Sequence, residues 1–188
     1  MGDFVNTINV VGDDVLCGSI IDKSVTEFKD DKITLVGEYA FYYCENLKTL
    51  EIPNVVEIKT AAFYDCTSLG SVKLPSLVYT SNQIFRGCTS LKKAEFFVLN
   101  KLSDAEFSNC INLSALILRM QKLCPMGRTN ILSGTAIANG TGYVYVPRAL
   151  VDSYKTATNW STLSDQFRAL EDYTVDGTIT GELDESKI

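Results

Sequence analysis

Cysteine and carboxylate side chains are the groups in this sequence that could carry chemistry. The 188 residues include six cysteines and 23 aspartates and glutamates, but no histidine. The absence of histidine excludes Ser-His-Asp and Cys-His catalysis, and every zinc or iron site that uses an imidazole ligand. An enzyme would have to rely on carboxylates, tyrosine, lysine or an unpaired thiol.

Four of the cysteines, Cys44, Cys66, Cys88 and Cys110, recur every 22 residues. Their side chains should therefore point the same way from neighbouring chain segments about 4.8 Å apart. A disulfide needs converging side chains with Cβ atoms about 3.8 Å apart, and zinc needs four ligands around one point. We therefore predict a column of packed thiols that behave as small hydrophobic groups, with no metal and no cofactor.

The remaining cysteines and the carboxylates form no pattern that predicts catalysis. Cys17 and Cys124 fall outside the column, and of these two Cys124 is the one expected at the surface. No two carboxylates are placed by spacing for acid–base work, and Asp13-Asp14 and Glu171-Asp172 are expected in turns and at the surface. We therefore expect no catalytic residue and no enzyme. A hydrolase that acts on surface polymers through carboxylates is the least favoured alternative.

A repeat of 22 residues positions these side chains. In each copy a phenylalanine, a cysteine and a leucine follow one another at a spacing of three, and these residues are predicted to form the core. They are Phe41, Cys44 and Leu47; Phe63, Cys66 and Leu69; Phe85, Cys88 and Leu91; and Phe107, Cys110 and Leu113.

The period of the apolar residues changes inside each copy. The spacing of three from Phe41 to Leu47 is typical of a helical or 3₁₀ turn with one buried edge. The alternation that follows predicts a short strand with Leu50 and Ile52 facing inward. One such coil cannot bury enough apolar surface to fold alone, so the copies must stack into a solenoid.

The ends of such an array expose its core and need caps. We predict an N-terminal cap over residues 1–30, repeats over 31–146 with a longer last copy, and a C-terminal cap over 147–173 anchored by Trp160. Residues 174–188 lack aromatic side chains, and we expect them to form a mobile tail.

The repeat resembles a known family. The segment from Phe41 to Pro53, which reads Phe-x-x-Cys-x-x-Leu followed by Leu-x-Ile-Pro, is similar to the BspA-like leucine-rich repeat of bacterial surface proteins. The segment 135–147 resembles the terminal part of such proteins from gut Firmicutes and their prophages. The resemblance implies an α/β leucine-rich-repeat solenoid, a right-handed coil with a parallel sheet on one face. It also implies roles in adhesion, host contact or phage-particle structure, and no catalytic residues.

The outward strand positions are where binding is expected, because a solenoid presents one set of side chains per coil in rows. The two rows read Thr49, Ser71, Lys93, Ala115, Tyr143 and Glu51, Lys73, Glu95, Ile117, Tyr145. The charges in the second row alternate in sign, and we interpret them mainly as a surface charge ladder. The apolar end of the rows is either an exposed contact surface or is covered by the cap helix or by the chain after Trp160. These alternatives stay open.

The expected function is a non-catalytic binding, adhesion or scaffold module with a protein or glycan partner, and the alternative is a purely structural spacer. A net charge of −6 without a basic cluster argues against a nucleic-acid partner, and the apolar runs are too short for membrane insertion. The oligomeric state is not predicted. We expect a location at the cell surface, outside the cell or in a phage particle, although no secretory signal is visible in this chain.

Overall fold

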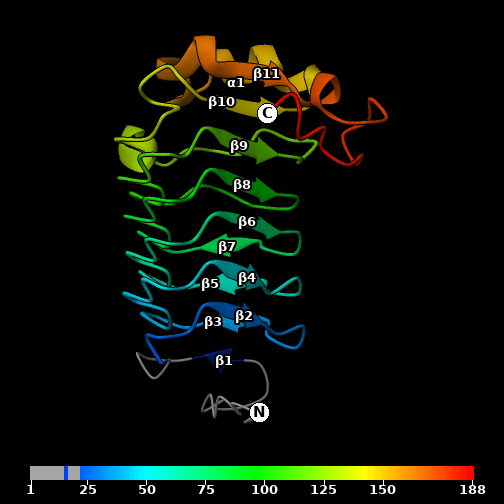
Figure 1. Cartoon of the computed structure of the whole chain (residues 1–188). Coiled ribbons are helices and arrows are strands. Elements are labelled where there is room, and N and C mark those ends of the chain that lie inside the picture. Colours follow the sequence, from blue (N-terminus) through cyan, green and yellow to red (C-terminus); the bar gives the residue numbers. More distant parts are fainter. Residues whose placement is uncertain (1–14, 17–21) are drawn as a thin grey trace.

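The computed structural model describes residues 15–16 and 22–188 and shows a stack of coils with a helical region at one end (Figure 1). The solenoid predicted from the repeat is confirmed. The predicted N-terminal cap falls largely on residues 1–14 and 17–21, which lie outside the described residues, as does Cys17.

The coils form two rows of short parallel strands, and the first row is confined to the earlier coils. The first row consists of β1 (Val15–Leu16), β3 (Leu35–Val36), β5 (Glu57–Ile58) and β7 (Tyr79–Thr80). The second row holds a two-stranded sheet of β2 (Glu27–Lys29) and β4 (Thr49–Glu51), followed by a five-stranded sheet. The five strands are β6 (Ser71–Leu74), β8 (Lys93–Phe96), β9 (Ala115–Leu118), β10 (Tyr143–Val146) and β11 (Phe167–Ala169). The register pairs Lys73 with Glu95, Glu95 with Ile117, and Ile117 with Tyr145, as the sequence rows predict. Strand β11, parallel to β10, lies within the region predicted only as a cap.

The turns between the rows hold neighbouring coils together through their backbone. The N–H groups of Tyr39, Phe41 and Tyr43 donate to carbonyls of the next coil at 3.1, 2.7 and 2.9 Å. This ladder recurs in later coils and accompanies left-handed backbone at two positions of the turn. The first position holds Tyr39, Ala61, Gln83 and Ala105, and the second holds Tyr43, Asp65, Gly87 and Asn109. Only Gly87 is a glycine, and a Cβ atom there would lie 1.7 Å from the Asp65 carboxylate.

The core is a ladder of the predicted columns. The Phe41, Phe63, Phe85 and Phe107 rings stack with centroids 4.8, 5.4 and 5.7 Å apart and planes within 16° of parallel. All four rings are fully buried, as are the cysteines and leucines of the same columns. Stacking of identical side chains buries both faces of each inner ring, which is why the array needs several copies.

The C-terminal cap packs on the last coils. It contains a 3₁₀ turn at Arg148–Leu150, helix α1 (Val151–Thr156), and further 3₁₀ segments at Trp160–Gln166 and Leu170–Tyr173, while another 3₁₀ turn at Thr129–Leu132 precedes β10. The Trp160 indole is fully buried against Tyr154 and Phe167, and its N–H donates to the Cys124 carbonyl at 2.7 Å. In the described part of the chain, no helix has the length and apolar character that crossing a membrane requires.

Candidate functional site

The outward face of the second strand row carries every residue for which binding is predicted. Its two ends differ sharply. Toward the N-terminus, Glu51, Ser71 and Lys73 are exposed, and Thr49 is half-buried. Toward the C-terminus, Ala115, Ile117 and Tyr145 are 2%, 0% and 2% exposed, and Lys93 and Tyr143 are half-buried.

The apolar end of the face is covered by the chain that follows the cap. Leu170 and Tyr173 pack on Ala115, Ile117 and Tyr145, joined by Ile179, Leu183 and Ile188. Of the two alternatives for this patch, burial under the chain after Trp160 is therefore the one that holds, and the patch is not a free contact surface. The cover fits because apolar side chains of the C-terminal segment meet the apolar end of the sheet face.

We call residues 174–188 the C-terminal strap. The sequence predicts a mobile tail here, but the strap packs on the face and beside the upper strands (Figure 1). Its fold is held locally, because Val175 N–H donates to the Glu182 carbonyl at 2.9 Å and Asp184 N–H to the Tyr173 carbonyl at 2.8 Å. An ion pair also joins Lys93 of β8 to Glu185. Aliphatic packing, local hydrogen bonds and this ion pair therefore hold the strap in place, although it contains no aromatic residue.

Glu95 corrects the predicted surface charge ladder, because its side chain is buried. It is 3% exposed, and Arg119 Nε donates to its Oε1 at 2.5 Å, while Lys73 Nζ lies 3.9 Å from Oε2. Arg119 is buried as well; it donates to the Ile179 carbonyl of the strap and stacks over Phe97 at 5.1 Å. Arg119 was not predicted as a site residue, because the same repeat position holds the uncharged Pro53, Pro75 and Phe97 in the other coils. A buried ion pair thus lies between the sheet and the strap.

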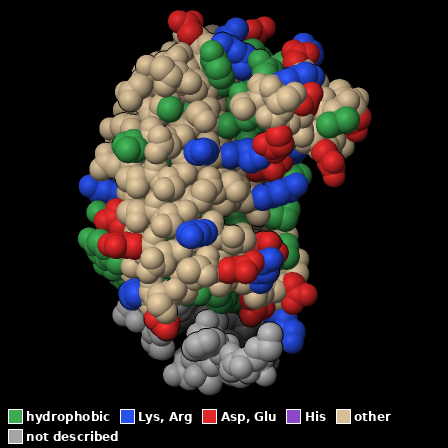
Figure 2. All heavy atoms as spheres, in the orientation of Figure 1, with side chains coloured by type: hydrophobic (Ala, Val, Ile, Leu, Met, Phe, Trp, Pro, Cys, Tyr) green, Lys and Arg blue, Asp and Glu red, His purple; other side chains and the backbone are tan. Residues whose placement is uncertain are grey.

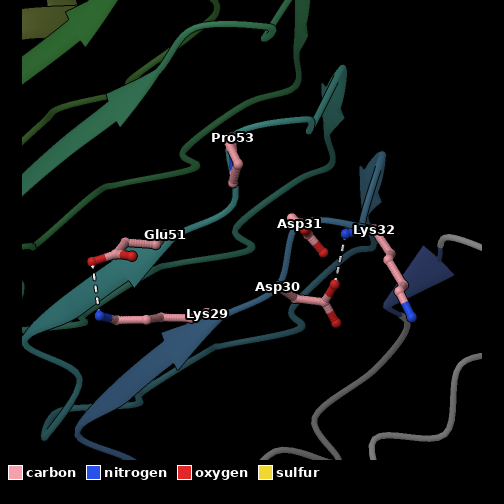
Figure 3. A pocket seen from close by; sticks show the side chains of 6 residues that line it. All are labelled: Lys29, Asp30, Asp31, Lys32, Glu51 and Pro53. Atoms are coloured by element: carbon pink, nitrogen blue, oxygen red, sulfur yellow. Dashed lines mark hydrogen bonds and ion pairs between the residues drawn. The ribbon is translucent and has the colours of Figure 1, made fainter.

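The open half of the face lies on β2, β4 and β6. Lys29 Nζ bridges Glu27 at 2.7 Å and Glu51 at 3.0 Å, so two neighbouring strands share one cation. Beside this pair is a shallow hollow lined by Lys29, Asp30, Asp31, Lys32, Glu51 and Pro53 (Figure 3). The carboxylates do not converge as an acid–base pair would, because Glu51 faces Lys29 and the Asp30 carboxylate accepts the Lys32 N–H at 2.8 Å.

Sequence comparison decides the family. The BspA type leucine rich repeat region matches residues 17–124 in six copies. The chain belongs to the BspA-type leucine-rich repeat family. Repeats therefore begin inside the region predicted as an N-terminal cap, consistent with the pairing of β2 and β4 in repeat register.

Solved structures share the fold of this BspA-type chain. A T. pallidum leucine rich repeat protein is 19% identical with a TM-score of 0.50, over 86% of this chain and 81% of that one. A leucine rich cell surface protein of Faecalibacterium prausnitzii is also 19% identical, with a TM-score of 0.47, over 71% of this chain. The alignment spans 45% of the length of that protein. No curated protein matches the chain at a significant level.

The cysteine column of the BspA-type repeat is buried and unpaired. Thiols of Cys66, Cys88 and Cys110 donate to phenylalanine carbonyls of the preceding coil at 3.2, 3.1 and 3.0 Å. They are therefore weak donors between coils as well as small apolar groups. Burial raises the pKa of Cys44 to about 11, which opposes thiolate chemistry. Over residues 15–16 and 22–188, no group of three or more Cys, Asp or Glu side chains is arranged to hold a metal ion.

Cys124 differs from its expected place. It is 1% exposed, and its N–H donates to the Tyr154 hydroxyl at 2.8 Å. Burial raises its pKa to about 12. Tyr154 and Trp160 of the predicted cap contact this cysteine, and the sequence around Cys124 does not reveal that contact.

Glu106 is a fully buried carboxyl group that was not predicted as a site residue. It is fully buried where the other coils carry Ala40, Ala62 and Ile84. Its Oε2 accepts the Ser103 N–H at 2.7 Å and the Thr80 hydroxyl at 3.3 Å, while Oε1 has no hydrogen-bond partner. Burial raises its pKa to about 8, and the two hydrogen bonds oppose the rise. A sealed carboxyl group cannot reach a substrate, so its effect is on stability.

We predict that Glu106 makes the protein less stable as pH rises. The pKa of about 8 in the folded state lies above the ordinary 4.5. The protonated carboxyl therefore contributes its full stability to the fold below pH 4.5, and that contribution is lost as pH rises toward 8. Between pH 5 and pH 7 the free energy of unfolding should fall by about 2 kcal/mol from this group. Urea denaturation of wild type and Glu106→Gln across this range checks it. The difference in unfolding free energy between the two proteins should change with pH. If their plots of unfolding free energy against pH ran parallel, the raised pKa would not belong to Glu106.

Proposed function

We propose that this chain is a non-catalytic recognition module that binds a protein partner through the open half of the sheet face. The observation that carries the proposal is the contrast between the two halves of that face. The apolar half is occupied by the strap, whereas Glu27, Lys29, Glu51 and Lys73 stand exposed on three neighbouring strands. Stacked strands hold the backbone beneath these side chains rigid, so little backbone entropy is lost on binding.

The chemistry of the open half supports a charged protein partner. Figure 2 shows acidic and basic side chains gathered side by side over the lower right of the molecule. Mixed charges of this kind direct orientation and association rate through complementarity. At the hollow the Glu51 carboxylate pairs with Lys29 and the Asp30 carboxylate accepts the Lys32 N–H, which supports binding rather than hydrolysis.

The location of the module is part of the proposal. The repeat resembles those of bacterial surface proteins, and we place this chain at a cell surface, where an exposed face can meet a protein from outside. A purely structural spacer is the alternative, because the strap already fills the apolar half of the face.

The test removes charged side chains from opposite strand rows. Surface and secreted proteins captured by the immobilised chain are purified and rebound in a biosensor assay at low and high salt. Replacing Lys29, Glu51 and Lys73 with alanine should weaken that binding at least tenfold. The control removes the ion pair between Glu57 of β5, in the other row, and Lys59, which follows β5, and this variant should bind like wild type. Equal losses in both variants, or no specific partner of wild type, would favour the spacer.

A further inference from the structure

A cluster of tyrosines lies on the turn edge of the first coils, away from the sheet face. Tyr39, Tyr42 and Tyr43 come from one coil and Tyr64 from the next. Tyr42 lies at the centre: its ring centroid is 5.4 Å from Tyr39, 4.5 Å from Tyr43 and 5.1 Å from Tyr64. We call these four residues the tyrosine platform. In Figure 2, hydrophobic side chains gather at the left edge over the lower coils, beside acidic and basic groups.

The platform combines exposed rings with polar groups. Tyr39 is 45% and Tyr43 is 43% exposed, whereas Tyr42 and Tyr64 are half-buried and support them. Asp65 is half-buried beside the platform. Burial raises the pKa of its carboxyl, and the Tyr43 hydroxyl and the charge of Arg86 oppose that rise. The Arg86 guanidinium lies 5.7 Å from the centre of the Tyr64 ring. The surface therefore offers apolar ring faces together with hydrogen-bond donors and acceptors.

The two exposed rings occupy costly backbone positions. Tyr39 and Tyr43 both have a φ of 57°, in the left-handed region that disfavours bulky side chains. The corresponding positions of later coils hold smaller or more compatible residues: Ala61, Gln83 and Ala105, and Asp65, Gly87 and Asn109. At the second position the later coils hold residues that tolerate this backbone, so the strain kept at the exposed Tyr43 points to a function of its side chain. At the first position Tyr39 carries a larger side chain than any later coil.

The chemistry of the platform selects among ligands. A sugar ring has C–H groups on its faces and hydroxyl groups around its rim, which match tyrosine rings bordered by a carboxylate and a guanidinium. A cationic ligand fits less well, because Arg86 already provides the cation over Tyr64. The structure assigns the tyrosine platform as a binding site for a neutral oligosaccharide, which stacks on Tyr39 and Tyr43 and hydrogen-bonds to Asp65. This site is separate from the sheet face and does not depend on the partner proposed there.

The test uses cellotetraose and chitotetraose, two neutral β-linked chains with flat sugar faces. Binding to the full chain is measured by saturation-transfer NMR and by calorimetric titration. At least one tetrasaccharide should bind wild type, and the Tyr39→Asn/Tyr43→Asn variant should bind it at least tenfold more weakly. Asparagine tolerates left-handed backbone, so this variant should melt at or above the wild-type temperature, which separates loss of binding from loss of fold.

Two further variants control the result. Tyr39→Phe/Tyr43→Phe keeps the rings and should bind within about threefold of wild type. Tyr79→Asn removes a tyrosine that is 55% exposed on β7, outside the platform, and should bind like wild type. The proposal is overturned if neither tetrasaccharide binds wild type, if the double asparagine variant binds normally, if the phenylalanine variant loses binding, or if Tyr79→Asn loses as much. Binding of choline in place of both sugars would also overturn it.

Discussion

The Arg119→Met variant should lose about 3–5 kcal/mol of unfolding free energy, the cost of leaving one partner of a buried ion pair alone. The change removes the 2.5 Å hydrogen bond to Glu95 and leaves a buried carboxylate beside Lys73, its remaining cation at 3.9 Å. It also removes the hydrogen bond to the Ile179 carbonyl, so the strap loses one of its contacts with the sheet while its apolar packing remains. Urea denaturation measures the first effect, and hydrogen exchange over residues 174–188 measures the second.

A double variant separates charge burial from packing. In Glu95→Leu/Arg119→Met both charges are absent, and most of the lost stability should return, because a buried pair replaced by apolar groups of similar size is often tolerated. The matched control is Arg148→Met, whose partner Asp172 forms an exposed pair with both side chains 58% accessible. That change should cost less than about 1 kcal/mol. Equal costs for Arg119→Met and Arg148→Met would show that the buried pair has no special role.

The second large effect is expected from Phe85→Ala. Phe85 is fully buried between Phe63 and Phe107, with ring centroids 5.4 and 5.7 Å away. Truncation leaves a cavity in the middle of the ladder and should cost about 3–5 kcal/mol. Phe85→Leu preserves much of the volume and should cost less than half as much.

Two probes test whether the array responds as one unit. Trp160 is the single tryptophan and lies in the C-terminal cap, so its fluorescence reports the cap, whereas far-ultraviolet circular dichroism reports the whole array. Because each coil contacts its neighbours, both transitions of Phe85→Ala should move together to lower urea concentration. A cost below about 1 kcal/mol would contradict the stacked ladder as the main source of stability. Separate transitions would show that the cap unfolds independently of the coils.

The pattern of apolar residues predicts the fold because every coil places its apolar side chains at the same spacing. A spacing of three followed by alternation places Phe41, Leu47 and Leu50 inward, and the structure buries all three. The register of the rows also follows from the repeat, since neighbours such as Lys73 and Glu95 differ by one full period. The left-handed turn positions do not stand out in the sequence, because Tyr39 and Ala61 occupy them in place of glycine.

The candidate site was only partly predictable, because the strap that covers half of the face lies outside the repeat. The sequence by itself determined the stacked coils, the inward columns and the outward rows, because these depend on contacts one period apart. The tertiary structure alone decided that Ala115, Ile117 and Tyr145 are covered and that Glu95 pairs with Arg119 beneath the strap. The contacts that place the strap join residues as far apart as Arg119 and Ile179, or Lys93 and Glu185. Contacts over such distances follow no period, so no local sequence pattern predicts them. Their free energy depends on surfaces that form only after the coils have stacked.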